Sequence, residues 1–329
     1  MSALSLANVE LALRRAAVQA TLAPSVHNTQ PWRFVLTESA LELYADPARQ
    51  LRVLDPTGRQ MLVSCGCAVL NARASLAASG YRGTAELFPD PEQPNLVARL
   101  TGQVDRSPDA DPLAALDAVA ELRRTNRRRF ADDPVPDELV EGLVAAAEAE
   151  QATLVPIRRE EDRIAVAVVQ QRADREQNSD PAYRAELRAW TTDDPDRSDG
   201  VPALAVPHGG VAQDDVPIRD FDTRGTGGLP TETHSSVKQC MVLIGTAADD
   251  ATSWVRAGQA LERVLLEITR HGFVASTLTQ AVELPATREA LRSQLKLSMY
   301  PHVLLRIGRA PTTPAPRRRR LVDMLTEAE

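Results

Sequence analysis

The sequence of 329 residues is poor in several residue types, and each scarcity excludes a class of protein. Only 4% of the residues are aromatic, and only Cys65, Cys67 and Cys240 are cysteines. Three cysteines are too few, and odd in number, to build a disulfide framework. We therefore expect the protein to occupy a reducing compartment. Cys65 and Cys67 lie in an apolar, helix-like run. This indicates buried thiols, with metal or redox chemistry as the alternative.

The chain also lacks the signals of membrane and secreted proteins. No apolar run approaches the length of a membrane span, and the first residues lack the pattern of a secretory signal. The formal net charge of −7 argues against binding nucleic acid through an overall basic surface. We therefore expect a cytoplasmic protein without nucleic-acid or membrane partners.

Hydrophobic periodicity predicts helices and strands in an order that occurs twice. The first part predicts a helix over 8–22, ended by Pro24, and a helix over 58–79, stopped at Gly80. Residues 101–112 are polar and rich in Asp and Pro, as linkers are. The predicted strands are "WRFVLT", "LELYAD", "RGTAELF" and "LVARL", then "ATLVPI", "VKQCMVLIGT" and "PHVLLRIG". Three later helices are predicted. One begins at Pro136-Asp137, and the other two are "EEDRIAVAVVQQRADREQ" and "SWVRAGQALERVLLEITRHG".

An internal repeat supports a duplicated α+β unit. In each copy a glycine is followed fourteen residues later by a second glycine and an aromatic residue, and alanine stands two past the first glycine. We therefore predict two halves, residues 1–112 and 113–329. The matching residues are Gly66, Ala68, Gly80 and Tyr81 in the first copy and Gly258, Ala260, Gly272 and Phe273 in the second.

A long segment of the second half, about residues 188–236, has little periodicity and much Gly, Pro and Asp. A structureless stretch of this length inside a compact chain is usually a lid, a binding loop or disorder. Its apolar residues Trp190, Ile218 and Phe221 favour an ordered covering loop over disorder.

Two polar motifs are candidates for a binding site. "APSVHNTQPWRF", residues 23–34, joins a helix to a strand and is either a connecting loop or a ligand-binding loop. "RRTNRRRF", residues 123–130, is either a solvated basic face or an anion site. Lysine occurs only at 238 and 296, so the basic charge is almost all arginine, whose planar fork grips phosphate or carboxylate.

The first motif resembles the Pro-Ser-x-x-Asn-x-Gln-Pro-Trp signature of nitroreductase-like FMN flavoproteins. "RRTNRRRF" resembles the family's phosphate-binding motif, and "AGQALERVLLEITRHGFVAS" and "IGRAPTTPAPRRRRL" resemble its central helix and C-terminal region. The resemblance is greatest to the mycobacterial, dormancy-associated Acg-like subfamily. It implies an α+β fold in which two nitroreductase-like halves, each a central antiparallel-type sheet flanked by helices, form an intramolecular pseudo-dimer. It further implies a lid and one FMN site.

The resemblance also implies which residues hold FMN. The loop residues suit the flavin ring, whose polar edge needs donors and acceptors, and the arginines suit its phosphate. His27 either contacts the flavin or caps the loop. We expect Trp32 to be a core residue. The implied cofactor-binding residues are Pro24, Ser25, His27 and Asn28 in the loop; Arg124, Asn126, Arg128, Arg318 and Arg319 at the phosphate; and Ser276, Thr277 and Leu278 beside the ring.

Two functions follow from the resemblance, and a third remains open. The first is NAD(P)H-dependent reduction of nitroaromatic or quinone-type acceptors through FMN, with NADH or NADPH as the reductant and no catalytic side chain. The second is FMN storage, with the flavin shielded by a lid. The third is a structural protein without flavin. The scattered histidines give no metal-ligand spacing. We expect a monomer that acts as a pseudo-dimer, or a weak homodimer.

Overall fold

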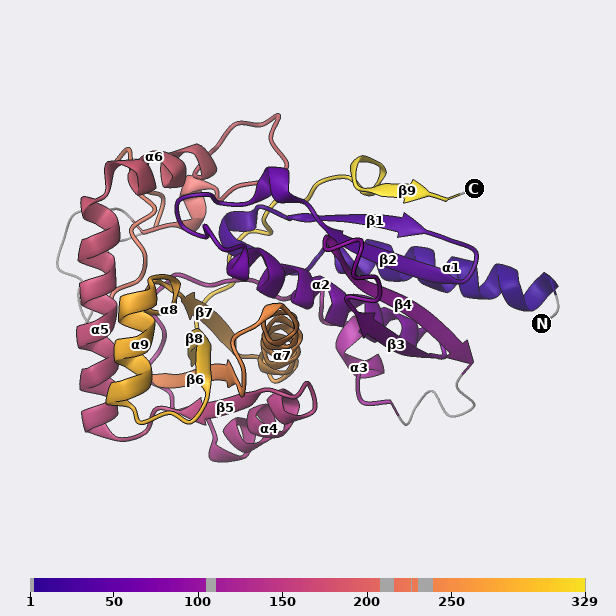
Figure 1. The fold of residues 1–329 in the computed structure, drawn as a ribbon. Coiled ribbons are helices and arrows are strands. Elements are labelled where there is room, and N and C mark those ends of the chain that lie inside the picture. The colour runs from indigo at the N-terminus through magenta and orange to yellow at the C-terminus, as the bar shows by residue number, and fades with distance from the viewer. Residues whose placement is uncertain (1–2, 105–110, 208–215, 226, 230–238, 329) are drawn as a thin grey trace.

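The computed structural model describes residues 3–104, 111–207, 216–225, 227–229 and 239–328 (Figure 1). The first half begins with α1 and ends with β4. Its elements are α1 (Ala3–Ala20), η1 (Val26–Asn28), β1 (Trp32–Leu36), β2 (Ala40–Ala45), η2 (Pro47–Arg49), α2 (Arg59–Ala78), β3 (Tyr81–Leu87) and β4 (Leu96–Val104).

The second half contains a second sheet and more helices. Its elements up to the second central helix are α3 (Ala114–Asp117), α4 (Asp137–Glu148), β5 (Thr153–Pro156), α5 (Glu160–Ser179), α6 (Pro181–Trp190), η4 (Ala203–Ala205), β6 (Cys240–Thr246) and α7 (Ala251–Arg270). They are followed by β7 (Val274–Leu278), α8 (Gln280–Glu283), α9 (Pro285–Gln294), β8 (Tyr300–Gly308), η5 (Leu321–Asp323) and β9 (Leu325–Glu327). Residues 237–238 of the predicted "VKQCMVLIGT" strand lie outside the described residues.

The two sheets have the same strand order, which confirms the predicted duplication. The first runs β3-β4-β2-β1 and is extended by β9, and the second runs β7-β8-β6-β5. All pairs within these four-stranded units are antiparallel. In each half the central helix, α2 or α7, connects the second strand of that half to the third. The fold is therefore a duplicated α+β unit in one chain.

The helices α2 and α7 cross at the two glycines of the repeat. A Cβ atom added to Gly66 would lie 2.1 Å from the carbonyl oxygen of Val255, and one added to Gly258 would lie 2.0 Å from that of Val63. The contact is reciprocal, as across the two-fold axis of a dimer. Gly80 and Gly272, at φ 82° and 73°, follow the two helices at equivalent positions. The repeated glycines thus allow the halves to pack backbone to backbone.

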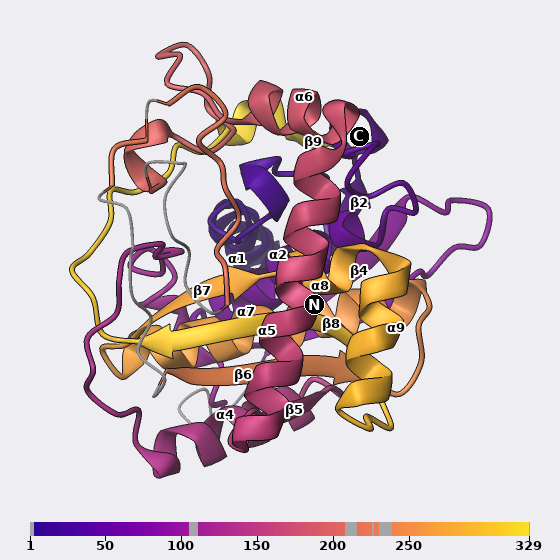
Figure 2. The same cartoon turned by 90° about the vertical axis from the view of Figure 1, so that its left-hand side faces the viewer.

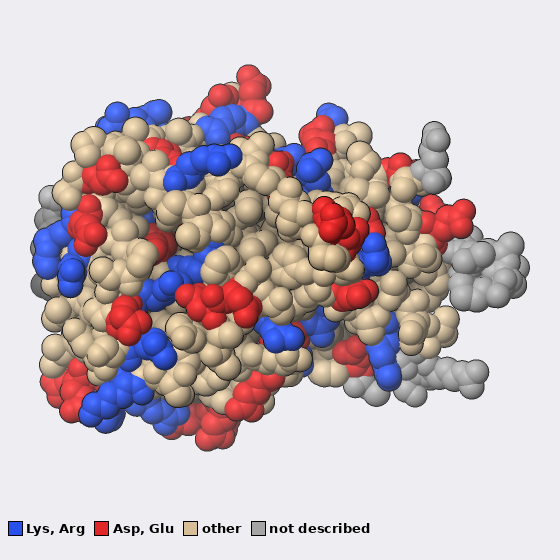
Figure 3. Space-filling view, in the orientation of Figure 1, with Lys and Arg blue, Asp and Glu red and all other residues tan. Residues whose placement is uncertain are grey.

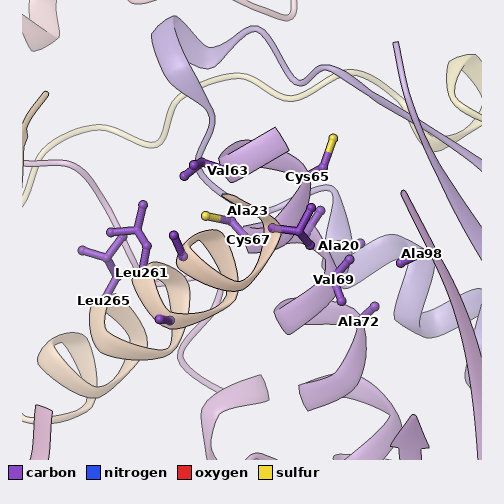
Figure 4. Packing of buried hydrophobic residues seen from close by; sticks show 14 of the residues in the cluster. Ala20, Ala23, Val63, Cys65, Cys67, Val69, Ala72, Ala98, Leu261 and Leu265 are labelled. Carbon is purple, nitrogen blue, oxygen red and sulfur yellow. The ribbon is translucent and has the colours of Figure 1, made fainter. Parts of the chain in front are cut away.

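The core extends from this crossing into both halves. One cluster of buried apolar residues includes side chains from α1, α2, α4, α7 and both sheets. Figure 4 shows Cys67 pointing toward α7 and Cys65 pointing away from it. The Cys67 Sγ lies 3.2 Å from the Gly258 carbonyl oxygen. Both thiols are free and buried, as expected, and burial raises the pKa of each above its ordinary value.

The helix α2 corrects one expectation. By length and composition its 20 residues could cross a membrane, although the sequence reading found no such run. In the structure 83% of its most apolar window is buried against the rest of the chain. Its apolar residues therefore form the core between the halves.

A further layer covers the outer face of the second sheet. Figure 2 shows α5 lying across that sheet with α9 beside it. Val166 and Val169 of α5 are buried in a cluster with Leu291 of α9 and Leu304 of β8. The sequence did not predict α6 or α9 as helices, although Pro181 and Pro285 occupy their first positions. Proline there is a helix-start signal.

The C-terminal tail returns from the second half to the first sheet. The strand β9 pairs parallel to β1, and the Phe34 amide donates to the Met324 carbonyl at 2.7 Å (Figure 1). Arg14 of α1 pairs with Glu327 at 2.8 Å. The tail was expected to supply arginines, but its strand was not predicted. Its path places residues 313–318 between the halves, beside the cavity described next.

Candidate functional site

A cavity lies at the junction of the two halves. It holds about 1180 Å³ of space that no protein atom fills, part of it open to solvent. Its lining comes from stretches that are far apart in the sequence. They lie within residues 24–28 and 60–67 of the first half and within residues 123–127, 200–205, 218–221, 277–280 and 313–318 of the second.

The loop after α1 has an unusual backbone conformation that aims it at this cavity. Pro24 follows the end of the helix, and His27 and Asn28 have φ values of 48° and 56°, in the left-handed region. The Ser25 hydroxyl accepts from the amide of Gln30 at 2.8 Å. The Ser64 hydroxyl of α2 accepts from the amide of Val26 at 3.2 Å. These bonds fix a turn whose polar side chains face inward.

Asn28 ties three segments together. Its Nδ2 donates to the Gly200 carbonyl at 3.0 Å and to the Arg317 carbonyl at 3.1 Å. Its Oδ1 accepts from Arg318 at 2.6 Å. Gln30 adds a bond from its Nε2 to the Ser198 carbonyl at 2.9 Å. The loop, residues 198–200 at the base of the predicted covering loop and the C-terminal tail therefore hold one another in place.

Arginines gather at one end of the cavity, which we call the phosphate end: Arg123, Arg124 and Arg318. Arg123 lies 3.4 Å from Glu262, and both side chains are buried. Burial raises the pKa of Glu262 to about 7, although Arg123 opposes this. Burial, and then the charge of Arg123, lower the pKa of Arg318 to about 9. Within the described residues, Arg124 and Arg318 form no ion pair with a carboxylate.

The other end, which we call the covered end, consists of His27, Arg127, Arg219 and Phe221. Arg219 pairs with the buried Glu283 of α8, and it also bonds to the Tyr183 hydroxyl. The Phe221 ring lies 5.2 Å from the His27 ring, centroid to centroid, in an edge-on contact. The Arg127 guanidinium lies 4.6 Å from the Phe221 centroid. One wall of the cavity is thus formed by Ile218, Arg219 and Phe221, which belong to the predicted covering loop of residues 188–236, called the covering segment below.

The structure brings eight of the twelve predicted site residues to the cavity. Asn126 is fully buried, and its side chain donates to the Pro311 carbonyl at 2.8 Å and accepts from the Arg128 amide at 3.0 Å. Ser276 is buried, and its hydroxyl has no hydrogen-bond partner among the described residues. Arg319 donates to the Gln30 carbonyl at 3.1 Å. The lining includes Pro24, Ser25, His27, Asn28, Arg124, Thr277, Leu278 and Arg318, but not Asn126, Arg128, Ser276 or Arg319.

Several lining residues were missed by the sequence reading. Arg127 lines the cavity, whereas its predicted neighbour Arg128 does not. Arg219 comes from a segment without periodicity, so no pattern marked it. Phe221 and Ile218 were expected as apolar anchors of the covering loop, and both line the cavity. Trp32 is fully buried in the core, as expected.

The rest of the predicted 188–236 loop is only partly described. Residues 188–190 belong to α6, where the Trp190 ring lies 5.6 Å from the Arg49 guanidinium and 5.4 Å from that of Arg197. Residues 208–215, 226 and 230–236 lie outside the described residues. His208 and His234 are among them. In the described part of the chain, no cluster of His, Cys, Asp and Glu could hold a metal ion.

Comparison with known proteins identifies the family. The chain is 33% identical over 305 residues to the Mycobacterium tuberculosis H37Rv protein named "Putative NAD(P)H nitroreductase Rv3131", covering 91% of this chain and 87% of that protein. The chain belongs to the nitroreductase family. It is also 30% identical over 305 residues to the protein of the same strain named "Putative NAD(P)H nitroreductase acg". That match covers 92% of this chain and 90% of the acg protein. The expected resemblance to Acg-like proteins is therefore confirmed.

Solved structures resemble this nitroreductase-family chain at low identity. A nitroreductase with bound FMN from Desulfitobacterium hafniense has 13% identity and a TM-score of 0.42, covering 65% of this chain and 98% of that one. The FMN-dependent nitroreductase NfnB from Mycobacterium smegmatis, solved with NADPH, has 17% identity and a TM-score of 0.36, covering 61% and 89%. No protein-family model matches the chain.

Proposed function

We propose that the chain binds one FMN in the cavity and reduces nitroaromatic or quinone-type acceptors with NADH or NADPH. The observation that carries this proposal is the charge of the cavity. Five arginines line it, and among the described residues no carboxylate does. The names of the relatives, which describe NAD(P)H nitroreductases, support the reaction class.

The residues present fit FMN. Its phosphate carries about two negative charges, and Arg124 and Arg318 supply two positive charges that form no ion pair with a carboxylate among the described residues. Buried polar atoms without a partner also lie at the cavity, among them Arg318 Nε and both ring nitrogens of His27. Such atoms cost free energy unless a ligand satisfies them.

The chain's own residues would bind and orient the cofactor. Arg124 and Arg318 would hold the phosphate, and the Pro24–Asn28 loop and residues 277–278 would hold the ring. When bound, FMN supplies the hydride chemistry. We assign no side chain of this chain a role as acid, base or nucleophile in the reaction.

The site is shared between two halves, which we propose to divide at residues 112 and 113. The loop comes from the first half and the arginines from the second, so one chain supplies what two subunits would. The repeated strand order supports this division. We propose a monomer that acts as a pseudo-dimer and takes a small-molecule acceptor. Figure 3 shows acidic and basic side chains interspersed over one face, without a continuous basic patch there. We propose no nucleic-acid partner. A cytoplasmic location stays a prediction.

The covering segment favours storage of FMN as a second candidate function. It is held by the buried Arg219–Glu283 pair, and its base by the bonds from Asn28 and Gln30. A wall fixed in this way would shield the ring from nicotinamide and acceptor. A wall that opens would permit turnover.

An anaerobic absorbance titration separates the two functions. We expect NADH or NADPH to bleach the oxidised flavin band of the purified protein, because hydride transfer needs an accessible ring. Dithionite gives the full extent of bleaching as the control. A flavin band that only dithionite bleaches would support storage instead. Purified protein that carries no flavin and takes up none would contradict both.

Substitutions at the phosphate end test the binding site. We expect Arg318→Ala and Arg124→Ala each to raise the Kd of FMN by about ten- to a hundredfold, since a hydrogen bond to a charged group contributes about 1.5–3 kcal/mol. The measurement is a fluorescence titration of flavin-free protein. Arg129→Ala, an exposed arginine of the same motif, is the matched control. Equal effects of Arg124→Ala and Arg129→Ala would contradict the assignment.

The same titration tests the choice of Arg128 made from the sequence pattern. Arg128 does not line the cavity. We therefore expect Arg128→Ala to leave the Kd of FMN close to that of wild type. An increase as large as that caused by Arg124→Ala would favour the original choice.

A further inference from the structure

The cationic side chains of the cavity fall into two groups. Arg123 and Arg318 both donate to the Leu22 carbonyl, at 3.5 and 3.1 Å, and Arg124 donates to the Arg123 carbonyl at 2.7 Å, so these three side chains lie close together. Arg127 is influenced by burial and by Arg219 instead, and its pKa falls to about 10. The cavity therefore has positive charge at its covered end as well as at its phosphate end.

Among the described residues, Arg127 is the cation of the covered end that has no ion pair. Arg219 has Glu283 as its partner, whereas Arg127 forms no ion pair or hydrogen bond within the described residues. The Arg127 guanidinium lies over the face of the Phe221 ring, 4.6 Å from the ring centroid. Arg127 is half-buried, and burial lowers the pKa of its guanidinium to about 10, so an anionic group at this place would stabilise its charge.

His27 supplies an independent indication of a ligand. Its side chain is only 6% exposed and lines the cavity, and neither ring nitrogen has a hydrogen-bond partner in the part of the chain that the structure describes. Burial, and then the charges of Arg219 and Arg127, lower its pKa well below the ordinary value. The imidazole is therefore neutral at pH 7 and offers one N–H donor and one acceptor. A ligand oxygen that binds Arg127 can also accept a hydrogen bond from the His27 N–H.

On the proposed function, Arg124 and Arg318 hold the FMN phosphate, which carries about two negative charges. Arg127 would then remain available at the other end of the cavity. Phe221 provides an aromatic face beside Arg127 and His27. Among the described residues, the covered end thus combines an aromatic wall, a cation without an ion pair and a neutral donor.

Building on the proposed function, we propose that the covered end selects acceptors that are aromatic and carry a carboxylate. Arg127 and His27 bind the carboxylate, and Phe221 contacts the ring. A neutral aromatic acceptor leaves Arg127 without a counter-ion and binds more weakly.

The test compares two ligands of nearly equal size that differ in charge, 4-nitrobenzoate and 4-nitrobenzamide. Their Kd values for FMN-loaded protein are measured in the oxidised state by calorimetry, so that no turnover is needed. We expect nitrobenzoate to bind at least about tenfold more tightly, since a charged hydrogen bond is gained. Arg127→Lys should keep the preference and Arg127→Met should abolish it. His27→Leu should reduce it, and Arg129→Met, the surface control, should leave it unchanged.

Two results would overturn the proposal: equal Kd values for the two ligands, or a preference that survives Arg127→Met. Equal values would indicate that Arg127 serves the cofactor. The FMN content of each protein is measured separately by absorbance, and the titrations of variants use saturating FMN. Wild-type protein that takes up no FMN would refute the proposed function alone. The charge preference would then still be measured on the flavin-free chain, because protein side chains create it.

Discussion

Replacing Gly258 by alanine is expected to lower the free energy of unfolding by about 3 kcal/mol or more, at the upper end of what overpacking costs. The new Cβ would lie 2.0 Å from the Val63 carbonyl oxygen and 2.9 Å from the Gly66 Cα. Both are backbone atoms, so no side-chain rotation relieves the clash. The helices α2 and α7 would have to move apart, and with them the two halves that line the cavity.

Gly142→Ala is the matched control for this substitution. Gly142 lies on the exposed side of α4, and a Cβ added there meets no atom within 4 Å. Because alanine is the better helix former, we expect this change to stabilise the chain by about 0.5–1 kcal/mol. Urea unfolding of both variants gives the comparison. A Gly258→Ala variant as stable as wild type would mean that the helices do not cross at these glycines.

Gly66→Ala should destabilise the chain as much as Gly258→Ala does. The contact is reciprocal, since the Cβ of the first would meet the Val255 carbonyl oxygen at 2.1 Å. Similar losses for the two substitutions are the result expected of an internal two-fold axis. A large loss at one glycine and none at the other would indicate an asymmetric crossing.

The repeat in the sequence predicted the duplicated fold, but not the contact that joins the copies. Spacing within each copy marks Gly66 and Gly258 as equivalent, because helix periodicity is a local property. That they touch depends on how two distant helices cross. For the same reason the pairing of β9 with β1 was not predicted, although "LTE" is a short strand in a tail rich in arginine and proline.

The candidate site was predictable where a motif carried it. The loop residues 24–28 and Arg124 were selected by their pattern, and they line the cavity. The sequence could not show that Arg127 lines the cavity and Arg128 does not. Both are arginines, and the path of the backbone decides which side chain faces the cavity. Arg219 lies in a segment without periodicity, and its partner Glu283 is far along the chain.

Replacing Glu283 by glutamine is expected to lower the free energy of unfolding by about 3–5 kcal/mol at pH 7, because it leaves the charge of Arg219 buried without its counter-ion. Both side chains of this pair are buried, at 7% and 0% exposure. Glu267→Gln is the matched control. It removes an ion pair with Arg270 on the surface, at 2.8 Å, which contributes less than about 1 kcal/mol. Equal losses in the two variants would show that Arg219 does not depend on Glu283.

The pH dependence of this loss has a definite sign. Burial raises the pKa of Glu283, but Arg219 and the hydrogen bonds outweigh burial and hold it below the ordinary value of 4.5. A lowered pKa in the folded state contributes stability that is present above the unfolded value and disappears as the pH falls through the folded value. The gap in stability between wild type and Glu283→Gln should therefore stay constant near neutral pH and narrow below about pH 4.5. A gap that widened in acid would contradict the assignment.

The same variant connects stability with access to the cavity. Glu283 holds Arg219, and Arg219 stands two residues before Phe221 in the covering segment. Loosening this pair should let the segment open more often, so bleaching of the flavin by NAD(P)H should become faster in Glu283→Gln than in Glu267→Gln. If wild type is a store of FMN, the variant should gain the bleaching that wild type lacks. Unchanged bleaching in a clearly destabilised variant would mean that the covering segment does not control access.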